Sequence, residues 1–339
     1  MNLELDRALS IKQTHLHQLL NRRNVVGVGV GYKESEGRVT DELAVVVNVA
    51  RKVPSAQLAA GDTVPRDLEG IRTDVVETGR FLAGQVTAQA EETKGRWRPT
   101  IPPGVSIGHI EVTAGTFGCL VRRGAEIFAL SNNHVLANVN QGQPGDAIIQ
   151  PARYDGGGLA DQVATLAEYI PLDFGGSSST CNLASGVETA LNAVAQTLGS
   201  SHRVMTYQTT AGENLVDVAL ARPLDPSQFI PDIFKIGRPK GVQAATLGTR
   251  VQKTGRTTGH TTGQIVQIDV TSSVDYNGRM ATFTHQLMAS GMSAGGDSGS
   301  AVLDEQGYVV GLLYAGSSSA TLINPIQTVL DLLNLEIVL

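Results

Sequence analysis

The sequence contains little of what marks several large classes of protein. It has 2 cysteines among 339 residues, Cys119 and Cys181, so disulfides do not hold it together and a reducing cytoplasm is its expected location. No run of about 18 apolar residues occurs, so we expect no membrane-spanning helix. Residues 1–20 carry acids early and no apolar segment, which is unlike a secretory signal. The net charge of -6 argues against a nucleic-acid partner, which needs a clustered basic face.

Signals for a cofactor are also weak. His15 and His17 stand two apart on a predicted helix, so they do not share a face that could hold a metal. The glycines of VGVGVGYK alternate within a predicted strand instead of leading from a strand into a helix, and no GKS or GKT phosphate loop occurs. We therefore expect no metal and no other cofactor, and we expect both cysteines to be buried or unreactive thiols.

What the sequence does contain is typical of a globular protein rich in strands. Hydrophobic residues make up 41% and charged residues 17%, which suffices for a sizeable core. Glycine is abundant, with 38 residues, whereas aromatic residues make up only 4%. This composition favours tight turns that join strands rich in valine, threonine and isoleucine, and the length favours about two domains.

The first 95 residues are predicted to form a small α/β domain. Leucines at helical spacing predict a helix over residues 2–23. Two β-rich stretches, 25–33 and 42–52, follow as a hairpin or as neighbouring strands, and a short helix with a loop leads to a third strand at 71–79. Residues 92–104 carry charges and three prolines without periodicity, so we interpret them as a linker.

From residue 96 to residue 339 the pattern predicts a second, mainly β domain. Short apolar segments recur between Gly-rich turns, which is typical of an all-β barrel or sandwich. Residues 181–200 are rich in alanine and leucine and predict a helical insertion. Residues 326–337 repeat an apolar face at helical spacing and predict a C-terminal helix.

Three stretches of this domain carry residues suited to nucleophilic catalysis. GGDSGS (295–300) holds Ser298, ALSNNHVLA (129–137) holds His134, and Asp217 interrupts the apolar run NLVDVALARP (214–223). Each alone is more often a turn former, a structural histidine or an edge-strand aspartate. Together they offer what a weak serine nucleophile needs, a base within reach and a carboxylate that orients it. The amides of Gly296 and Ser298 could point at one developing oxyanion.

These motifs resemble those of a known family. SNNHVLA, VDVALA and GGDSGSAV are similar to the His, Asp and Ser motifs of the chymotrypsin/trypsin-like serine peptidases. KTGRTTGHTTGQI (253–265) resembles a strand and turn of the streptogrisin and α-lytic group, and NNHV resembles the HtrA-type peptidases. The overall arrangement looks closest to bacterial trypsin-like peptidases related to the plant narrow-leaf protease, which have a small domain ahead of the catalytic one. The peptidase resemblance covers roughly residues 100–339.

The resemblance implies a chymotrypsin-like double β-barrel and a role for each matched residue. His134 would be the general base and then the general acid, and Asp217 would hold the imidazole tautomer. Ser298 would attack the carbonyl carbon and become acylated. The amides of Gly296 and Ser298 would form the oxyanion hole, and Asp297 would pair internally to structure the loop.

The sequence departs from the family pattern at the disulfide and in the primary pocket. Val135 stands where the family usually has a cysteine, which leaves Cys119 without a partner. Met292 occupies the position that sets the base of the pocket, and Ala315 and Gly316 would form its wall. A neutral pocket for a small or medium apolar side chain follows, so cleavage after lysine or arginine is not expected.

Two further choices stay open at this level. Asp161 in GLADQVATL is a rival for the orienting carboxylate, although Asp217 fits the family motif better. The function expected first is a cytoplasmic serine endopeptidase acting on polypeptides. The alternatives are a non-catalytic peptide-binding protein on the same fold and an esterase with the same triad. Residues 1–95 could pack on the catalytic domain, mediate a homo-oligomer or cover the cleft.

Overall fold

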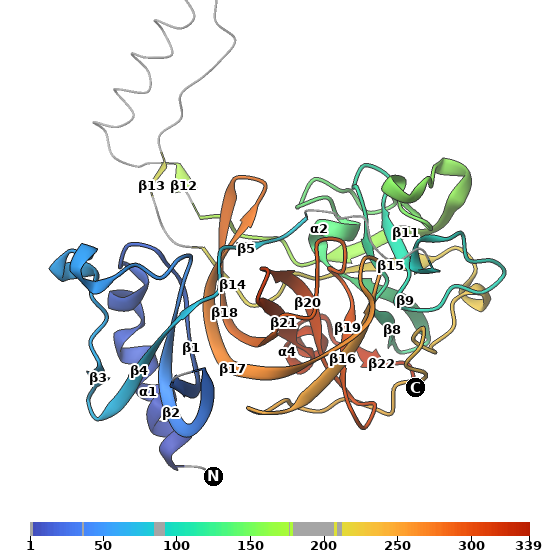
Figure 1. Ribbon diagram of the computed structural model, residues 1–339. Coiled ribbons are helices and arrows are strands. Elements are labelled where there is room, and N and C mark those ends of the chain that lie inside the picture. The colour runs from blue at the N-terminus through green and yellow to red at the C-terminus, as the bar shows by residue number, and fades with distance from the viewer. Residues whose placement is uncertain (1–2, 36, 85–91, 176, 179–206, 209–211) are drawn as a thin grey trace, which may run out of the picture.

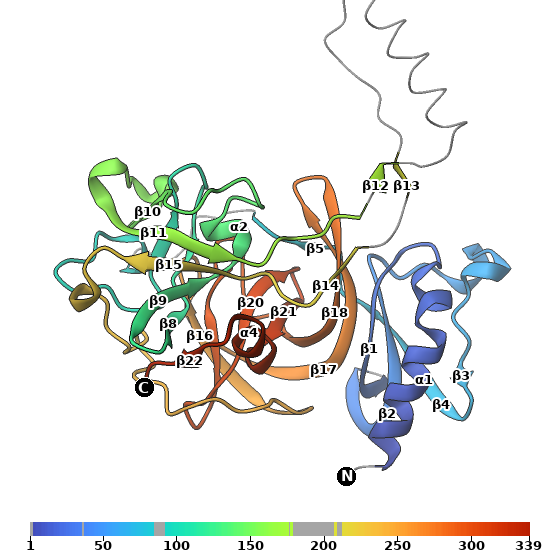
Figure 2. The ribbon, with the colours of Figure 1, turned by 180° about the vertical axis from the view of Figure 1, so that it is seen from behind.

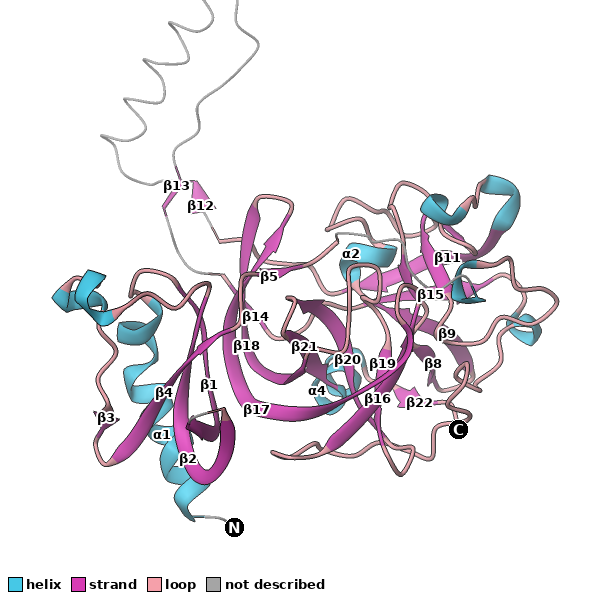
Figure 3. Cartoon of the chain, viewed as in Figure 1, coloured by secondary structure: helices cyan, strands magenta, loops and turns pink. Residues whose placement is uncertain are grey.

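A computed structural model shows an N-terminal α/β unit beside two β-rich bodies (Figure 1). It describes residues 3–35, 37–84, 92–175, 177–178, 207–208 and 212–339. Strands predominate, and most of the helices are short (Figure 3). The mainly β fold class is therefore confirmed. The predicted helix over residues 181–200 lies outside the described residues.

The N-terminal unit is one helix packed on a small sheet. Its elements are α1 (Leu3–Leu20), β1 (Val25–Ser35), β2 (Arg38–Val49), β3 (Asp67–Leu68) and β4 (Ile71–Glu77), with the 3₁₀ turns η1 (Ser55–Gln57) and η2 (Ala60–Asp62). Strand β2 pairs antiparallel with β1 and parallel with β4. Alternate valines such as Val28, Val30 and Val45 are fully buried and pack against Ala8 and Ile11 of α1. The expected helix and strands are confirmed, and the expected short helix is replaced by the two 3₁₀ turns.

The alternating glycines of β1 explain how this unit joins the rest of the chain. Strand β1 pairs antiparallel with β17 (Gly259–Tyr276), so the small sheet continues into a 12-stranded sheet. A Cβ at Gly29 would lie 2.7 Å from Gln267 Oε1, and one at Gly31 would lie 2.5 Å from the Val266 carbonyl oxygen. The valines therefore face the helix while the glycines let β17 approach closely.

The first β-rich body is an 8-stranded sheet that curls on itself. In pairing order its strands are β22 (Glu336–Ile337), β8 (Cys119–Arg123), β9 (Glu126–Ser131), β15 (Ala219–Pro223), β11 (Gln162–Tyr169), β10 (Ala147–Ile149), β6 (Ser106–His109) and β7 (Gly115–Thr116). Only two residues separate β7 from β8, yet these strands lie near opposite ends of the order. The sheet therefore bends round into a barrel, which an apolar cluster including Ile107, Phe117 and Ala219 fills.

The second β-rich body is a closed ring of strands. In pairing order they are β18 (Arg279–Ser290), β21 (Ala320–Pro325), β20 (Val309–Gly316), β19 (Ala301–Asp304), β16 (Arg250–Gly255) and β17, which pairs again with β18. Strand β5 (Phe81–Leu82), from the segment that leaves the N-terminal unit, pairs with both β17 and β20. Strand β14 (Glu213–Asn214) adds to β18, and β12 (Ser177–Ser178) pairs with β13 (Tyr207–Gln208).

The C-terminal helix closes the space between the barrels. Helix α4 (Ile326–Leu333) lies over β20 and β21 when the molecule is seen from behind (Figure 2). Its Val329 and Leu330 pack with Leu130 of β9 and Leu303 of β19 in one apolar cluster. The predicted C-terminal helix is therefore confirmed, and it ties the last strand, β22, to the first barrel.

The interpretation of residues 92–104 as a linker is wrong, because this segment packs on the first barrel. The segment begins with the 3₁₀ turn η3 (Glu92–Lys94). The Trp97 amide donates to Gln150 Oε1, and Ile101 is fully buried. Prolines keep the segment out of regular strands, while its apolar side chains still fill the barrel. Short 3₁₀ turns also occur at η4 (Arg153–Asp155), η5 (Leu159–Asp161) and η6 (Pro226–Gln228).

None of the helices in the described part of the chain has the length and apolar character needed to span a bilayer.

Candidate active site

His134 lies on a single helical turn that follows directly from a strand of the first barrel. Strand β9 ends at Ser131, and the turn is α2 (Asn133–Leu136). The His134 side chain is buried, and its Nδ1 lies 2.5 Å from Asp217 Oδ2. Its other ring nitrogen, Nε2, is buried and has no hydrogen-bond partner among the residues that the structure describes. A buried ring nitrogen without a partner is costly unless something binds there, so Nε2 is free for a substrate or a nucleophile.

Asp217 is fully buried and is surrounded by donors. Oδ2 accepts from His134 Nδ1 and from the Tyr276 hydroxyl at 2.7 Å, and Oδ1 accepts from the His134 amide at 3.3 Å. Its own amide donates to Asn324 Oδ1, and its carbonyl accepts from Asn132 Nδ2. An ionised carboxylate can only accept, so this arrangement places the imidazole proton on Nδ1 and leaves Nε2 as the basic nitrogen.

Tyr276 is a site residue that the sequence did not reveal. It comes from the end of β17 in the second barrel and is 3% exposed. Its ring meets the His134 ring edge to face, with centroids 5.6 Å apart. Burial, and then the neighbouring charge of Asp217, raise the pKa of Tyr276 well above its ordinary value. The hydroxyl therefore stays protonated and remains a donor to the carboxylate.

Ser298 lies in the tight loop between β18 and β19 and lines a cavity. Its Oγ lies 3.3 Å from the Tyr314 carbonyl oxygen, a long bond. No hydrogen bond joins His134 to Ser298, both of which the structure describes. The Ser298 loop nevertheless lies against the first barrel, at β7 and at the end of the strand that leads to His134. The Thr116 amide donates to the Ser298 carbonyl, and a Cβ at Gly299 would lie 2.0 Å from the Oγ of Ser131.

The backbone of this loop leaves several amides without an acceptor among the described residues, including the two expected in the oxyanion hole. The amides of Asp297, Gly299 and Ser300 all donate to backbone carbonyls. Among the described residues, the amides of Gly296 and Ser298 have no acceptor. Gly296 has a φ of 101°, which glycine adopts without strain, and a Cβ there would lie 2.4 Å from Thr257 Oγ1. Two free amides in one turn form a pair of donors suited to an anion.

Asp297 anchors the loop through its buried side chain, as the family resemblance implied. Its carboxylate is fully buried and pairs with Lys253 Nζ at 3.1 Å. It also accepts from the amides of Thr257, Thr258 and Ala294 and from the Thr258 hydroxyl. Burial lowers the pKa of Lys253, and the charge of Asp297 partly offsets this. The KTGRTTG stretch is therefore the support on which the Ser298 loop rests.

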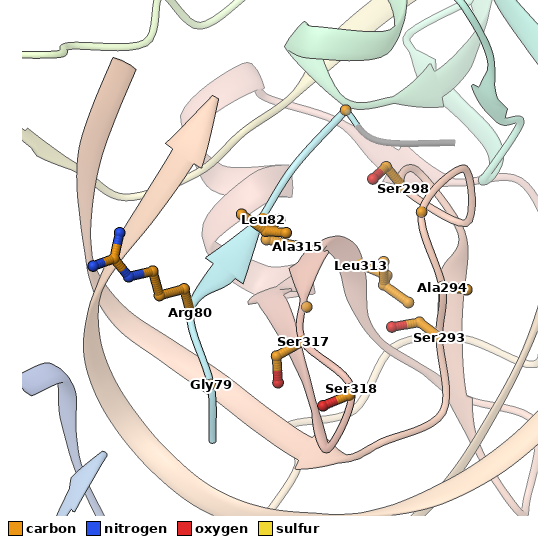
Figure 4. A pocket seen from close by; sticks show the side chains of 13 residues that line it. Gly79, Arg80, Leu82, Ser293, Ala294, Ser298, Leu313, Ala315, Ser317 and Ser318 are labelled. Atoms are coloured by element: carbon orange, nitrogen blue, oxygen red, sulfur yellow. The ribbon is translucent and has the colours of Figure 1, made fainter. Parts of the chain in front are cut away.

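A cavity of about 340 Å³ opens beside Ser298 (Figure 4). Ala315 and Gly316 line it, together with Leu313 and the small residues 293–295 and 317–318. Met292, expected at its base, does not line it; that side chain is 4% exposed in the apolar cluster inside the second barrel. Ser293, the next residue along the chain, lines the cavity in its place.

Asp161, the rival carboxylate, is engaged elsewhere. Its two oxygens accept from Arg96 Nε at 2.5 Å and Nη2 at 2.8 Å. The hydrogen bond from Arg96 lowers the pKa of Asp161. It therefore fixes residues 92–104 to the first barrel rather than orienting His134.

Cys119 is a buried free thiol, and burial raises its pKa to about 12. Cys181 lies outside the described residues. Within the described ranges, no three His, Cys, Asp or Glu residues come together as a metal site.

Comparisons with known proteins agree with this arrangement. A family described as Trypsin matches residues 182–332, and one described as NARROW LEAF 1 N-terminal domain matches residues 4–77. The first range contains Asp217 and Ser298, whereas His134 precedes it. The comparison with curated proteins gives no match.

Several solved structures resemble the chain at low identity. Thermobifida fusca protease A is 18% identical with a TM-score of 0.46, and the match covers 70% of this chain and 98% of that one. Cellulomonas bogoriensis chymotrypsin is 17% identical with a TM-score of 0.43 and the same coverage. Nocardiopsis protease is 14% identical with a TM-score of 0.44, again covering 70% and 98%. Likenesses this low carry no residue's role to this chain.

Proposed function

We propose that this chain, which carries a domain of the trypsin family behind a NARROW LEAF 1 N-terminal domain, is a serine endopeptidase with the triad His134, Asp217 and Ser298. One observation supports this most. His134 is held by a buried carboxylate through Nδ1, while its Nε2 has no partner among the described residues. The strand that leads to His134 lies against the serine loop, in which the amides of Gly296 and Ser298 lack an acceptor within the described part of the chain. Such an arrangement suits proton transfer from an alcohol and stabilisation of an oxyanion.

The reaction would run in two halves. Rotation of the Ser298 side chain away from the Tyr314 carbonyl would bring Oγ to His134 Nε2, which takes the proton as Oγ bonds to the substrate carbonyl carbon. The oxygen of that carbonyl becomes negative and accepts from the Gly296 and Ser298 amides. The C–N bond then breaks, and His134 returns the proton to the leaving amine. Water repeats the sequence to release the acid and restore Ser298.

Tyr276 and Asn324 act as positioning residues in this proposal. Tyr276 donates to Asp217 Oδ2, and Asn324 accepts from the Asp217 amide. Asn324 in turn donates to Gln286 Oε1. From the second barrel, Tyr276 holds the Asp217 carboxylate and Asn324 holds its backbone amide, while His134 comes from the first barrel. The triad therefore depends on how the two barrels pack.

The cavity supports a preference for a small or medium apolar side chain before the scissile bond. Leu313, Ala315 and Gly316 supply apolar surface, and the remaining lining on that side consists of glycine, alanine and serine. Arg80, the charged residue of the lining, points away from Ser298 (Figure 4). The described residues of the lining include no carboxylate, so none of them compensates a buried lysine or arginine side chain of a substrate.

A covalent fluorophosphonate probe tests the assignment. The wild-type chain should be labelled, and Ser298→Ala should abolish labelling and lower peptide turnover by roughly 10⁶. Ser227→Ala is the matched control, because that hydroxyl bonds to Asp225 on the remote η6 turn and should leave both readouts unchanged. A Ser298→Ala variant that keeps substantial turnover would overturn the triad.

A non-catalytic peptide-binding protein is the second candidate. The bond from Ser298 Oγ to Tyr314 favours it, because the hydroxyl does not face its base. Well-folded wild-type protein that binds peptides yet takes up no probe would support this reading over the endopeptidase. An esterase with the same triad would turn over esters and leave peptides intact.

We propose two domains, residues 1–95 and 96–339, of which the first is a regulatory or assembly domain. The free thiol of Cys119 supports a reducing cytoplasm as the location. A homo-oligomer stays a prediction, which a mass measurement in solution checks.

A further inference from the structure

The segment that leaves the N-terminal unit forms one wall of the cavity beside Ser298. Gly79, Arg80, Leu82 and Gly84 all line it (Figure 4). Within this segment, β5 inserts between two strands of the second barrel. It runs antiparallel to β20, with Leu82 opposite Gly316, and parallel to β17. The edge of β20 that borders the cavity is therefore already paired with a strand of the chain's own.

The register of this pairing directs the segment toward Ser298. In an antiparallel ladder, two steps forward on one strand match two steps back on the other. Leu82 opposite Gly316 thus aligns Gly84 with Tyr314, whose carbonyl oxygen lies 3.3 Å from Ser298 Oγ. A peptide added to β20 in this register would bring its backbone to the proposed nucleophile at the position of residue 84.

We propose that residues 79–84 occupy the peptide-binding groove of this chain as an internal competitor, and that the groove takes extended peptides which replace β5 on the edge of β20. The proposal rests on the proposed function for the cleavage step only, because occupancy of the groove needs no chemistry. The chain would then be restrained until the segment withdraws.

The backbone at the ends of the segment explains why it can occupy the groove without placing one of its own peptide bonds where Ser298 could attack it. An extended strand has a φ of about −120°, whereas Gly84 has a φ of 80° and Gly79 a φ of 75°. The extended path therefore covers residues 80–83 alone and ends before the position aligned with Tyr314. A substrate would have to continue extended past that point to offer its carbonyl to Ser298.

The segment is held firmly but not permanently. Phe81 is 1% exposed and packs in the apolar cluster of the second barrel, and the Ala83 amide donates to the Asp275 carbonyl at 3.1 Å. Leu82 is only half-buried because its side chain faces the cavity. A tethered segment acts at an effective concentration on the order of millimolar, so a free peptide of similar affinity competes poorly.

A binding experiment tests this without relying on turnover. A fluorescent peptide of sequence Gly-Arg-Phe-Leu-Ala-Gly is titrated into the full chain carrying Ser298→Ala, and anisotropy is recorded. Leu82→Glu, which puts a carboxylate into an apolar wall, should weaken the internal segment and tighten peptide binding at least about tenfold. Leu82→Met should bind the peptide as the parent does. Leu159→Glu makes the same change at a remote exposed leucine and should also leave binding unchanged.

Hydrogen exchange provides a second measurement that needs no further variant. Saturating peptide should accelerate exchange of the Ala83 amide, because the peptide displaces β5 from its partners. Equal peptide affinity in the Leu82→Glu and Leu82→Met variants, with Ala83 exchange unchanged by peptide, would overturn the proposal. Loss of the endopeptidase assignment would appear instead as absent fluorophosphonate labelling, with the peptide results intact.

Discussion

Replacing Lys253 with methionine should loosen the loop that carries Ser298. The side chain is fully buried, and its Nζ donates to Asp297 Oδ2 and the Gly259 carbonyl at 3.1 Å and to the Thr258 hydroxyl. Methionine fills nearly the same volume but removes every donor, which isolates the effect of the charge and its bonds. Removing one partner of a buried ion pair costs about 3–5 kcal/mol of stability.

The surroundings of Asp297 place the expected loss near the lower end of that range. The carboxylate keeps three amide donors and the Thr258 hydroxyl after Lys253 is gone, so it is not left bare. We expect Lys253→Met to lower the free energy of unfolding by about 3 kcal/mol in urea titrations. The rate of fluorophosphonate labelling should fall at least tenfold, because the amides of Gly296 and Ser298 flank the loosened aspartate.

A double-mutant cycle separates the pair from other effects of the substitution. Asp297→Asn should cost less stability in the Lys253→Met background than in the wild type, with a coupling of about 1–3 kcal/mol. Lys240→Met, at an exposed lysine, is the control and should change stability by less than about 0.5 kcal/mol. A Lys253→Met chain within about 1 kcal/mol of wild type and labelled at the same rate would refute the reasoning.

Three further predictions concern titratable groups. Tyr276→Phe removes a hydrogen bond to a charged carboxylate, so kcat should fall about tenfold with KM unchanged, and an equal fall in the Ser227→Ala control would contradict this. Burial raises the pKa of Tyr276, so above a pH of about 10 the folded chain keeps the phenol proton that the unfolded chain loses. The free energy of unfolding should therefore fall as the pH rises above about 10. Urea midpoints measured against pH should show a gentler fall in Tyr276→Phe. Cys119, with its pKa raised to about 12, should resist iodoacetamide at pH 8 in a Cys181→Ser chain until urea unfolds it, and rapid alkylation of the native chain would disprove its burial.

The sequence predicted the larger elements because their patterns are local. Apolar residues at helical spacing marked α1 and α4, and short apolar segments between glycine-rich turns marked most strands of both barrels. Strand β5 was not predicted, because its two residues are too few to show any periodicity. The pairing of β1 with β17 could not be predicted either, since it joins residues more than 200 positions apart, and the alternate glycines that permit it read as ordinary strand glycines.

The candidate site likewise contains residues that the sequence marks and residues that it does not. His134, Asp217 and Ser298 each stand in a short motif, so a reader of the sequence can find them. Tyr276 stands in an unremarkable hairpin, 59 positions from the carboxylate to which it donates. The choice between Met292 and Ser293 at the cavity depends on which way one side chain of an irregular turn points, and neither composition nor spacing determines that.

Strand β17 makes the proposed triad mechanically sensitive to the N-terminal unit. Near its middle it pairs with β1. Reciprocal hydrogen bonds between the side-chain amides of Asn48 and Gln267 add to this contact, as does the ion pair of the buried Lys12 with the partly exposed Asp269. At its end it carries Tyr276, whose hydroxyl donates a hydrogen bond to the Asp217 carboxylate. A force applied to the N-terminal unit by a partner or a neighbouring copy would be transmitted along one continuous strand to the Tyr276–Asp217 hydrogen bond. Such a force would alter how firmly Asp217 orients His134.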